Sequence, residues 1–116
     1  MVGLSRRDVV AQLVDARRDL LVVSGLGSAT WDLAAAGDTP ANFYLWGAMG
    51  GAAVMGLGLA LAQPERPILV LTGDGEMLMG LGSLATLAAA APKNLSLVIL
   101  NNGRYGETGM QRSHTA

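Results

Sequence analysis

The sequence has no cysteine among its 116 residues, which excludes a disulfide framework, a thiolate metal site and an iron–sulfur cluster held by this chain. Charged residues make up only 15% and the formal net charge is −1, so the charge does not favour nucleic acid or an anionic membrane surface as a partner. Aromatic residues are also scarce, at 4%, whereas small and aliphatic residues predominate. This composition suits a sheet buried on both faces by close-packed helices, or a large subunit interface.

A stretch without any charge runs from residue 41 to residue 63, so a small membrane-associated protein is one hypothesis. Gly47 and Gly51 even form a small-xxx-small pair of the kind found between membrane helices. The many glycines, the prolines that follow and the absence of a basic flank instead favour a tightly packed internal helix. No secretory signal is visible, because the N-terminus is polar and charged, and we therefore expect a cytoplasmic protein.

Apolar runs and polar turns alternate in the central stretch, residues 68–105. The run 68–72 precedes Gly73-Asp74-Gly75, an Ala- and Leu-rich segment from 76 to 91 predicts a helix, and the run 95–100 precedes Asn101-Asn102. Two short buried strands separated by a helix of this length pair in parallel. Both polar turns are then expected side by side at the carboxyl edge of one sheet, where open α/β sheets bind ligands.

The residue types of these two turns suit a metal-bridged diphosphate. Asp74 is an ionised oxygen ligand and Asn102 a neutral one, and hard cations such as Mg²⁺ prefer oxygen ligands. Gly73 and Gly75 allow the backbone to turn sharply and to approach a ligand closely. The free N–H groups of the helix that begins at this turn favour a phosphate.

Gly-Asp-Gly, followed by 25 residues and then Asn-Asn, resembles the signature of thiamine diphosphate (ThDP) enzymes. The resemblance implies that Asp74, Asn102 and the carbonyl oxygen of Arg104 bind the Mg²⁺ that holds the cofactor's diphosphate. It makes Tyr105 a further candidate contact, and it implies a three-layer α/β fold with a mostly parallel sheet. A carboxylate beside a diphosphate is unfavourable unless it turns away, so we expect only backbone contacts from Glu76 and Met77.

A second motif, Gly47-Ala48-Met49-Gly50, resembles the turn of the same family that follows a short strand and precedes a Gly- and Ala-rich helix. The resemblance implies that Met49 supports the bend of the cofactor and forces its two rings into a V shape. The Gly47 carbonyl oxygen would then accept a hydrogen bond from the amine of the aminopyrimidine ring. The alternative is that Met49 is simply a core residue.

The N-terminal part predicts a helix and then a strand. Ser5 followed by Asp8 is a helix-capping pattern. An apolar stripe at helical spacing follows, made of Val9, Val10, Leu13, Val14 and Ala16. We interpret Arg17-Arg18-Asp19 as the solvated end of this helix.

A strand at residues 20–23 leads into a second glycine-rich turn, residues 24–30. Thr30 replaces the third glycine of a dinucleotide fingerprint, and no acidic residue follows at the expected place, so we reject a nicotinamide cofactor. In ThDP enzymes the corresponding turn lies against the cofactor, which makes Gly25, Gly27 and Ser28 candidates for binding it. A plain tight turn is the alternative.

The polar, glycine-rich segment 103–114 predicts a flexible active-site loop. Glu107 and His114, the only histidine, are possible proton relays. Arg104 and Arg112 would suit an anionic substrate. A solvated tail is the alternative for each of these side chains.

The resemblance implies that residues 1–116 form the diphosphate-binding (PP) domain of a ThDP enzyme, which we expect to be incomplete at its C-terminus. In the family, the Glu that activates the aminopyrimidine ring comes from a pyrimidine-binding domain or subunit, and Glu65, Glu76 and Glu107 are in the wrong context to replace it. The motifs are most similar to the sulfopyruvate and phosphonopyruvate decarboxylase group. We therefore expect half of an oligomeric 2-oxo acid decarboxylase that needs a partner, with a non-catalytic phosphate- or nucleotide-binding module as the alternative.

Overall fold

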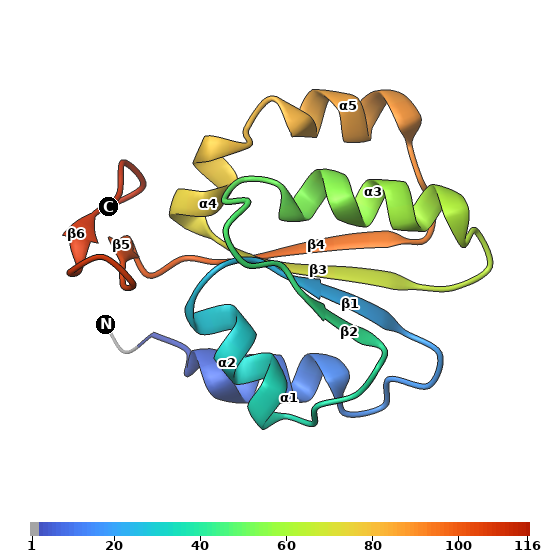
Figure 1. Ribbon diagram of the computed structural model, residues 1–116, viewed down its shortest axis with the longest axis horizontal. Coiled ribbons are helices and arrows are strands. Elements are labelled where there is room, and N and C mark those ends of the chain that lie inside the picture. The colour runs from blue at the N-terminus through green and yellow to red at the C-terminus, as the bar shows by residue number, and fades with distance from the viewer. Residues whose placement is uncertain (1–2) are drawn as a thin grey trace.

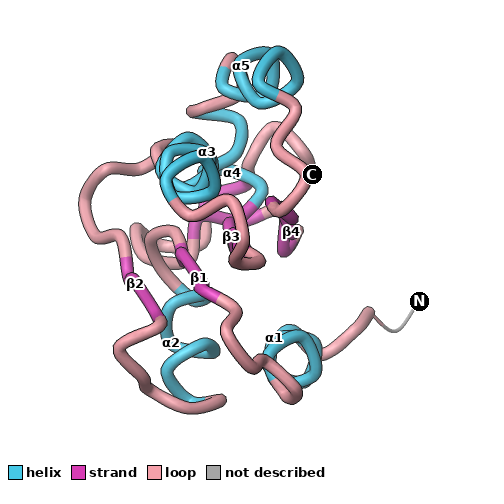
Figure 2. The backbone as a smooth tube through the Cα atoms, turned by 90° about the vertical axis from the view of Figure 1, so that its right-hand side faces the viewer, coloured by secondary structure: helices cyan, strands magenta, loops and turns pink. Residues whose placement is uncertain are grey.

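The computed structural model describes residues 3–116 and has three layers (Figure 1). A parallel sheet forms the middle layer, and pairs of helices cover its two faces. One face is covered by α1 (Arg6–Val14) and α2 (Ser28–Ala35), and the other by α3 (Ala52–Ala62) and α5 (Ser83–Ala90). Figure 2 shows the same layers from the end of the sheet. The predicted three-layer α/β fold is confirmed.

The sheet has the strand order β2-β1-β3-β4, and all of its neighbours are parallel. Its strands are β1 (Leu21–Ser24), β2 (Asn42–Tyr44), β3 (Ile68–Gly73) and β4 (Leu95–Leu100). The chain winds outward from β1 to β2 and then returns to the other side of β1 to form β3, so the order reverses between β1 and β3. Ligands of open α/β sheets bind at the carboxyl ends of the strands beside such a reversal.

Strand β3 is buried along almost its whole length because it is an inner strand covered on both faces. On the α1–α2 side its residues Leu69 and Leu71 pack with Val10 and Leu33. On the other side Val70 packs with Val23, Leu45 and Ala52. This alternation follows from the period of two along a strand.

The uncharged segment 41–63 forms β2, a turn and α3, and none of the helices within residues 3–116 is long and apolar enough to cross a bilayer. Gly56 shows why α3 contains small residues: a Cβ atom at this position would lie 2.2 Å from Cγ2 of Val70. The helix therefore lies directly on β3. The packed internal helix is the interpretation that the structure bears out.

One expected helix is broken in two. The segment 76–91 does not form one continuous helix. Helix α4 (Asp74–Met79) ends before Gly80, and α5 begins at Ser83. A Cβ atom at Gly80 would lie 2.1 Å from the carbonyl oxygen of Gly50, and Ser83 Oγ donates a hydrogen bond of 2.7 Å to the Gly80 carbonyl. The break results from this close approach of two turns, and the prediction of one helix was wrong.

The end of α1 also differs from expectation. Ser5 caps the helix as predicted, accepting a hydrogen bond from the Asp8 amide, but the helix ends at Val14, and Leu13 and Ala16 are exposed. Arg17 is not a solvated helix end. Its guanidinium donates 2.7 Å to Oδ1 of Asn42 and also reaches the carbonyl oxygens of residues 20 and 41. Arg17 therefore ties the start of β2 to the chain that enters β1.

The chain ends in a small antiparallel hairpin, β5 (Arg104–Tyr105) and β6 (Gln111–Arg112). Figure 1 shows this hairpin beyond the carboxyl edge of the sheet, on the same side as α4. Gly103 and Gly109 adopt φ angles of +66° and +120°, a region that favours glycine. The segment predicted as an active-site loop thus forms a hairpin beside the sheet edge.

Candidate cofactor-binding site

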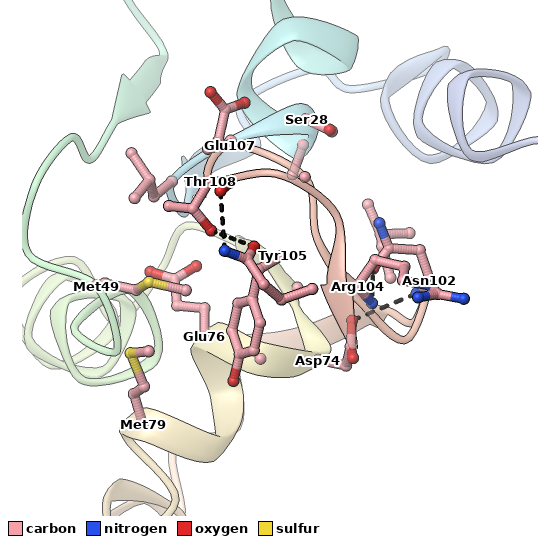
Figure 3. A pocket seen from close by; sticks show the side chains of 18 of the residues that line it. Ser28, Met49, Asp74, Glu76, Met79, Asn102, Arg104, Tyr105, Glu107 and Thr108 are labelled. Carbon is pink, nitrogen blue, oxygen red and sulfur yellow. Dashed lines mark hydrogen bonds between the residues drawn. The ribbon is translucent and has the colours of Figure 1, made fainter. Parts of the chain in front are cut away.

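A cavity of about 490 Å³ lies at the carboxyl edge of the sheet, between the turns that follow the strands and the C-terminal hairpin. Figure 3 shows Asp74, Asn102 and Arg104 on one side, Met49, Met79 and Glu76 on the other, and Tyr105 between them. Most residues predicted from the sequence line this cavity: Gly27, Ser28, Met49, Gly73, Asp74, Gly75, Glu76, Asn102, Arg104, Tyr105 and Glu107.

Asp74 and Asn102 lie together because β3 and β4 are paired in register, with Gly73 opposite Leu100. The Asp74 side chain is 3% exposed. Its Oδ1 accepts a hydrogen bond of 3.3 Å from the Asn102 amide, and its Oδ2 accepts hydrogen bonds from the hydroxyls of Ser113, at 2.5 Å, and Thr115. The side-chain oxygen of Asn102 accepts from the Arg104 amide at 3.0 Å.

Burial by itself would raise the pKa of Asp74, but hydrogen bonds from Ser113, Thr115 and the backbone amides of Asp74 and Asn102 outweigh it. The net result is a pKa below the ordinary value for an aspartate. Asp74 is therefore an ionised carboxylate at neutral pH. An anionic oxygen at this edge favours a bound cation.

The donors at this end of the cavity fit a hard divalent cation. Asp74 offers a carboxylate, Asn102 an amide oxygen and Arg104 a backbone carbonyl, which is the oxygen chemistry that Mg²⁺ takes. No group of three or more His, Cys, Asp or Glu side chains could hold a metal within residues 3–116. The candidate metal ligands are therefore one charged oxygen, from Asp74, and two neutral oxygens, from Asn102 and Arg104.

The hairpin packs closely on the glycines of the two other turns. A Cβ atom at Gly75 would lie 2.2 Å from the Tyr105 ring, and one at Gly27, whose φ is +97°, would lie 3.2 Å from Cγ of Glu107. Tyr105 thus covers the Asp74 turn, and Glu107 covers the turn after β1. Only residues without a side chain allow the hairpin to approach so closely.

The turn that carries Met49 is built on two glycines in the left-handed region, with φ of +87° at Gly47 and +96° at Gly50. Met49 is half-buried and lines the cavity beside Met79 (Figure 3). Its side chain therefore faces the candidate site rather than the core. The sequence motif predicts this arrangement only through the family resemblance.

Glu76 occupies a place that we did not foresee. Its side chain is 3% exposed, and it accepts hydrogen bonds from Thr72 Oγ1 at 2.7 Å and from the Gly50 amide at 3.3 Å. A Cβ atom at Gly25 would lie 1.6 Å from its Oε2. Gly25 thus contributes by making room for this carboxylate and does not line the cavity.

Four other predicted residues also lie outside the lining. Met77 is buried, Gly47 is exposed on the turn, and Arg112 and His114 are exposed near the end of the chain. Several lining residues were not predicted, among them Met79 and the polar residues Arg6 and Thr108. Asp32 could have indicated Arg6, because it is the one charged residue of α2 and would need a partner if buried; it pairs with Arg6. Thr108 is held by reciprocal hydrogen bonds with Gln111, for which the sequence carries no comparable signal.

Residues 11–116 match the family model described as thiamine pyrophosphate enzyme, C-terminal TPP binding domain. The chain belongs to this family. Thiamine pyrophosphate is another name for ThDP, so the resemblance to ThDP enzymes that the two turns carry is confirmed. Because the matched residues include β1 to β6, the family assignment covers every turn that surrounds the cavity.

The chain is 44% identical over 108 residues to the sulfopyruvate decarboxylase subunit beta of Methanothermobacter thermautotrophicus, covering 93% of this chain and 58% of that protein. It is 48% identical over 101 residues to the phosphonopyruvate decarboxylase of Streptomyces viridochromogenes, covering 87% of this chain and 25% of that protein. It therefore spans little more than half of the first relative and a quarter of the second.

A solved structure of a 2-oxoglutarate:ferredoxin oxidoreductase from Magnetococcus marinus shares the fold. The TM-score is 0.66 at 24% sequence identity, and the match covers 93% of this chain and 36% of that one. This likeness supports the architecture and leaves the reaction to be argued from the site.

Proposed function

We propose that this chain is the diphosphate- and Mg²⁺-binding part of a ThDP-dependent 2-oxo acid decarboxylase that acts on a sulfopyruvate- or phosphonopyruvate-like substrate. The observation that carries the proposal is the pairing of the Asp74 and Asn102 turns opposite the Met49 turn, across one cavity. The names of the two relatives support the substrate class. A cytoplasmic, oligomeric enzyme is part of the proposal.

In this proposal the Asp74 carboxylate, the Asn102 amide oxygen and the Arg104 carbonyl hold Mg²⁺. The backbone from Gly73 to Glu76 and the turn residues Gly27 and Ser28, which all line the cavity, surround the diphosphate. Met49, Gly47 and Tyr105 fix the orientation of the rings. Bound ThDP supplies the electron sink that decarboxylation of a 2-oxo acid requires.

In this proposal the polar side chains of the hairpin meet the substrate. Arg104, Glu107, Thr108 and Gln111 all line the cavity on the side of the hairpin. A guanidinium suits a sulfonate or phosphonate. Glu107 is the carboxylate of the hairpin that lines the cavity, and it could transfer a proton there. His114 lies outside the cavity, so Glu107 is the better of the two predicted proton relays.

The proposal requires a partner. The Glu76 side chain bonds to Thr72 and Gly50, and the Asp74 side chain is reserved for the metal, so neither is free to activate the aminopyrimidine ring. We infer that the activating Glu belongs to a pyrimidine-binding subunit or domain. The chain is then catalytic only in that complex.

Native mass spectrometry of the protein purified from its own cells with Mg²⁺ and ThDP tests the assembly. We expect a complex with a pyrimidine-binding polypeptide that retains ThDP. A monomer or homo-oligomer without ThDP would contradict the half-site and leave a phosphate- or nucleotide-binding module.

Titration of the same complex with ThDP, with Mg²⁺ or with EDTA, tests the metal site. Asp74→Asn should weaken Mg²⁺-dependent binding by more than the roughly 10- to 100-fold typical of residues that only support a metal ligand. Asp19→Asn, at an exposed aspartate away from the cavity, is the matched control. Binding that survives both EDTA and Asp74→Asn would mean that backbone amides alone hold the ligand.

A further inference from the structure

The Glu76 carboxylate is buried where three of the turns around the cavity meet. Oε2 accepts from Thr72 at the end of β3, Oε1 accepts from the Gly50 amide of the Met49 turn, and Gly25 of the turn after β1 lies directly against the carboxylate. These turns are far apart in the sequence. One side chain therefore connects them.

No cation meets this carboxylate in residues 3–116, where both recorded ion pairs belong to Asp32. Burying a carboxylate is costly unless hydrogen bonds satisfy it. A hydroxyl and a backbone amide satisfy Glu76, and no side-chain oxygen buried in the described part of the chain lacks a partner. Both carboxylate oxygens of Glu76 therefore have a hydrogen-bond partner.

Gly50 is held from two sides. Its amide donates to Glu76, and its carbonyl oxygen lies so close to Gly80 that a Cβ atom there would be 2.1 Å away. Met49 immediately precedes this fixed residue and lines the cavity. The position of the Met49 side chain relative to β3 is therefore set by the chain Thr72–Glu76–Gly50.

We propose that Glu76 is a positioning residue that fixes the Met49 turn against the Asp74 turn, which begins at the end of β3. The proposal rests on the function proposed above, since it assigns Glu76 to the support of the cofactor's bend. The role depends on hydrogen bonds rather than on charge. A glutamine can provide both, because its oxygen accepts from Gly50 and its amide donates to Thr72 Oγ1.

The first test needs no cofactor. Hydrogen exchange at the Gly50 amide is measured by NMR in the full chain and in four variants. Glu76→Ala and Thr72→Val should each speed exchange at Gly50 by about tenfold, because the acceptor is lost or its anchor is removed. Glu76→Gln and Thr72→Ser keep the hydrogen bonds and should leave the exchange within about twofold of the unsubstituted chain.

The second test uses the complex with the partner subunit. Glu76→Ala and Thr72→Val should weaken ThDP binding by about 10- to 100-fold, as for other supporting residues, while Glu76→Gln restores it. We expect the KM for the 2-oxo acid to change little at saturating ThDP, since the Glu76 carboxylate bonds to Thr72 and Gly50 rather than to the hairpin residues proposed to meet the substrate. A general loss of structure would not be rescued by glutamine in this way.

Unchanged exchange at Gly50 in Thr72→Val would overturn the proposal, even if Glu76→Ala does not fold. Failure of Glu76→Gln to restore exchange and ThDP binding would also overturn it, because charge would then be essential. If the unsubstituted complex binds no ThDP, the proposed function fails, whereas the exchange experiment still decides whether Glu76 fixes the turn. The two failures are therefore distinguishable.

Discussion

The α1–α2 layer and the carboxyl edge of the sheet both bury carboxylates, but they satisfy them in different ways. Asp32 in α2 has no exposed surface and pairs with Nε of Arg6 and, at 3.1 Å, with Nε of Arg7. At the sheet edge, Asp74 and Glu76 accept hydrogen bonds only from hydroxyls and amides. Every buried side-chain nitrogen and oxygen of the described residues has a partner, so the regions differ in the kind of partner.

This difference matches the structural role of Asp32 and the functional roles that we propose for Asp74 and Glu76. The charge of Asp32 is already compensated, so it joins α1 to α2 and offers nothing to a ligand. The charge of Asp74 is held by neutral donors and is open to compensation by a bound cation. Glu76 uses the same kind of donors to order backbone turns. Under the two proposals, the kind of hydrogen-bond partner, rather than burial, distinguishes the acidic residues of the site from Asp32.

Removing both arginines that pair with Asp32 should destabilise the α1–α2 layer more than any other change proposed here. Arg6→Ala with Arg7→Ala leaves Asp32 buried without a counter-charge, which we expect to lower the free energy of unfolding by about 3–5 kcal/mol. Urea denaturation at neutral pH measures the loss. Lys93→Ala, which removes an exposed charge, is the control and should change stability by less than about 0.5 kcal/mol.

A loss in the double variant no larger than that of Lys93→Ala would show that the Asp32 pairs contribute little. The two regions would then not differ in the way we describe. Because Arg6 also lines the cavity, ThDP binding is not a control for this variant.

A substitution at Gly80 tests the carboxyl edge of the sheet without changing a carboxylate. Gly80→Ala places a Cβ atom 2.1 Å from the Gly50 carbonyl, so the Met49 turn must shift, at a cost of about 1–3 kcal/mol in unfolding free energy. Gly82→Ala is the matched control, because a Cβ atom there meets nothing within 4 Å. We expect ThDP binding to weaken in Gly80→Ala only. Equal stability of the two variants by thermal denaturation would contradict the close contact between Gly50 and Gly80.

The fold and the position of the cavity were predictable because they depend on local patterns. Apolar runs of strand length ending in polar turns at Asp74 and Asn102 predict parallel strands with both turns at one edge, and the register of β3 and β4 produces that arrangement. The Met49 turn was predictable only through its resemblance to the ThDP family. Its glycines at 47 and 50 then adopt the positive φ angles that such a turn needs.

The remaining features depend on contacts between segments distant in the sequence. Gly80 interrupts the helix from 76 to 91 because it meets Gly50, thirty positions away, and a helix pattern carries no information on that contact. Glu76 was expected to contribute only its backbone, because a carboxylate next to a diphosphate is unfavourable. Its carboxylate accepts hydrogen bonds from Thr72 and Gly50, and the position of the Gly50 donor follows from the tertiary structure alone.

Tyr44 packs on the α1–α2 side and is a neutral group at neutral pH. Its titration should have only a small effect on stability. Burial raises its pKa, the hydrogen bond from Asn42 lowers it, and the contact of its hydroxyl with Asp38 at 2.8 Å raises it, so the net pKa lies above the ordinary value of 10.0. A pKa raised in the folded state means that the unfolded chain loses this proton first. The associated stability is therefore complete below about pH 10 and is lost as pH rises through the folded-state pKa.

Tyr44→Phe removes this titration and should flatten the pH dependence. Between pH 8 and about pH 10.5, the urea midpoint of the unsubstituted chain should fall more than that of Tyr44→Phe. The difference should be well under 1 kcal/mol, because Tyr44 lies at the rim of the layer and part of its surface meets water. Parallel pH profiles would show that the neutral phenol contributes nothing beyond its packing, and only the buried ion pairs would then distinguish the α1–α2 layer from the sheet edge.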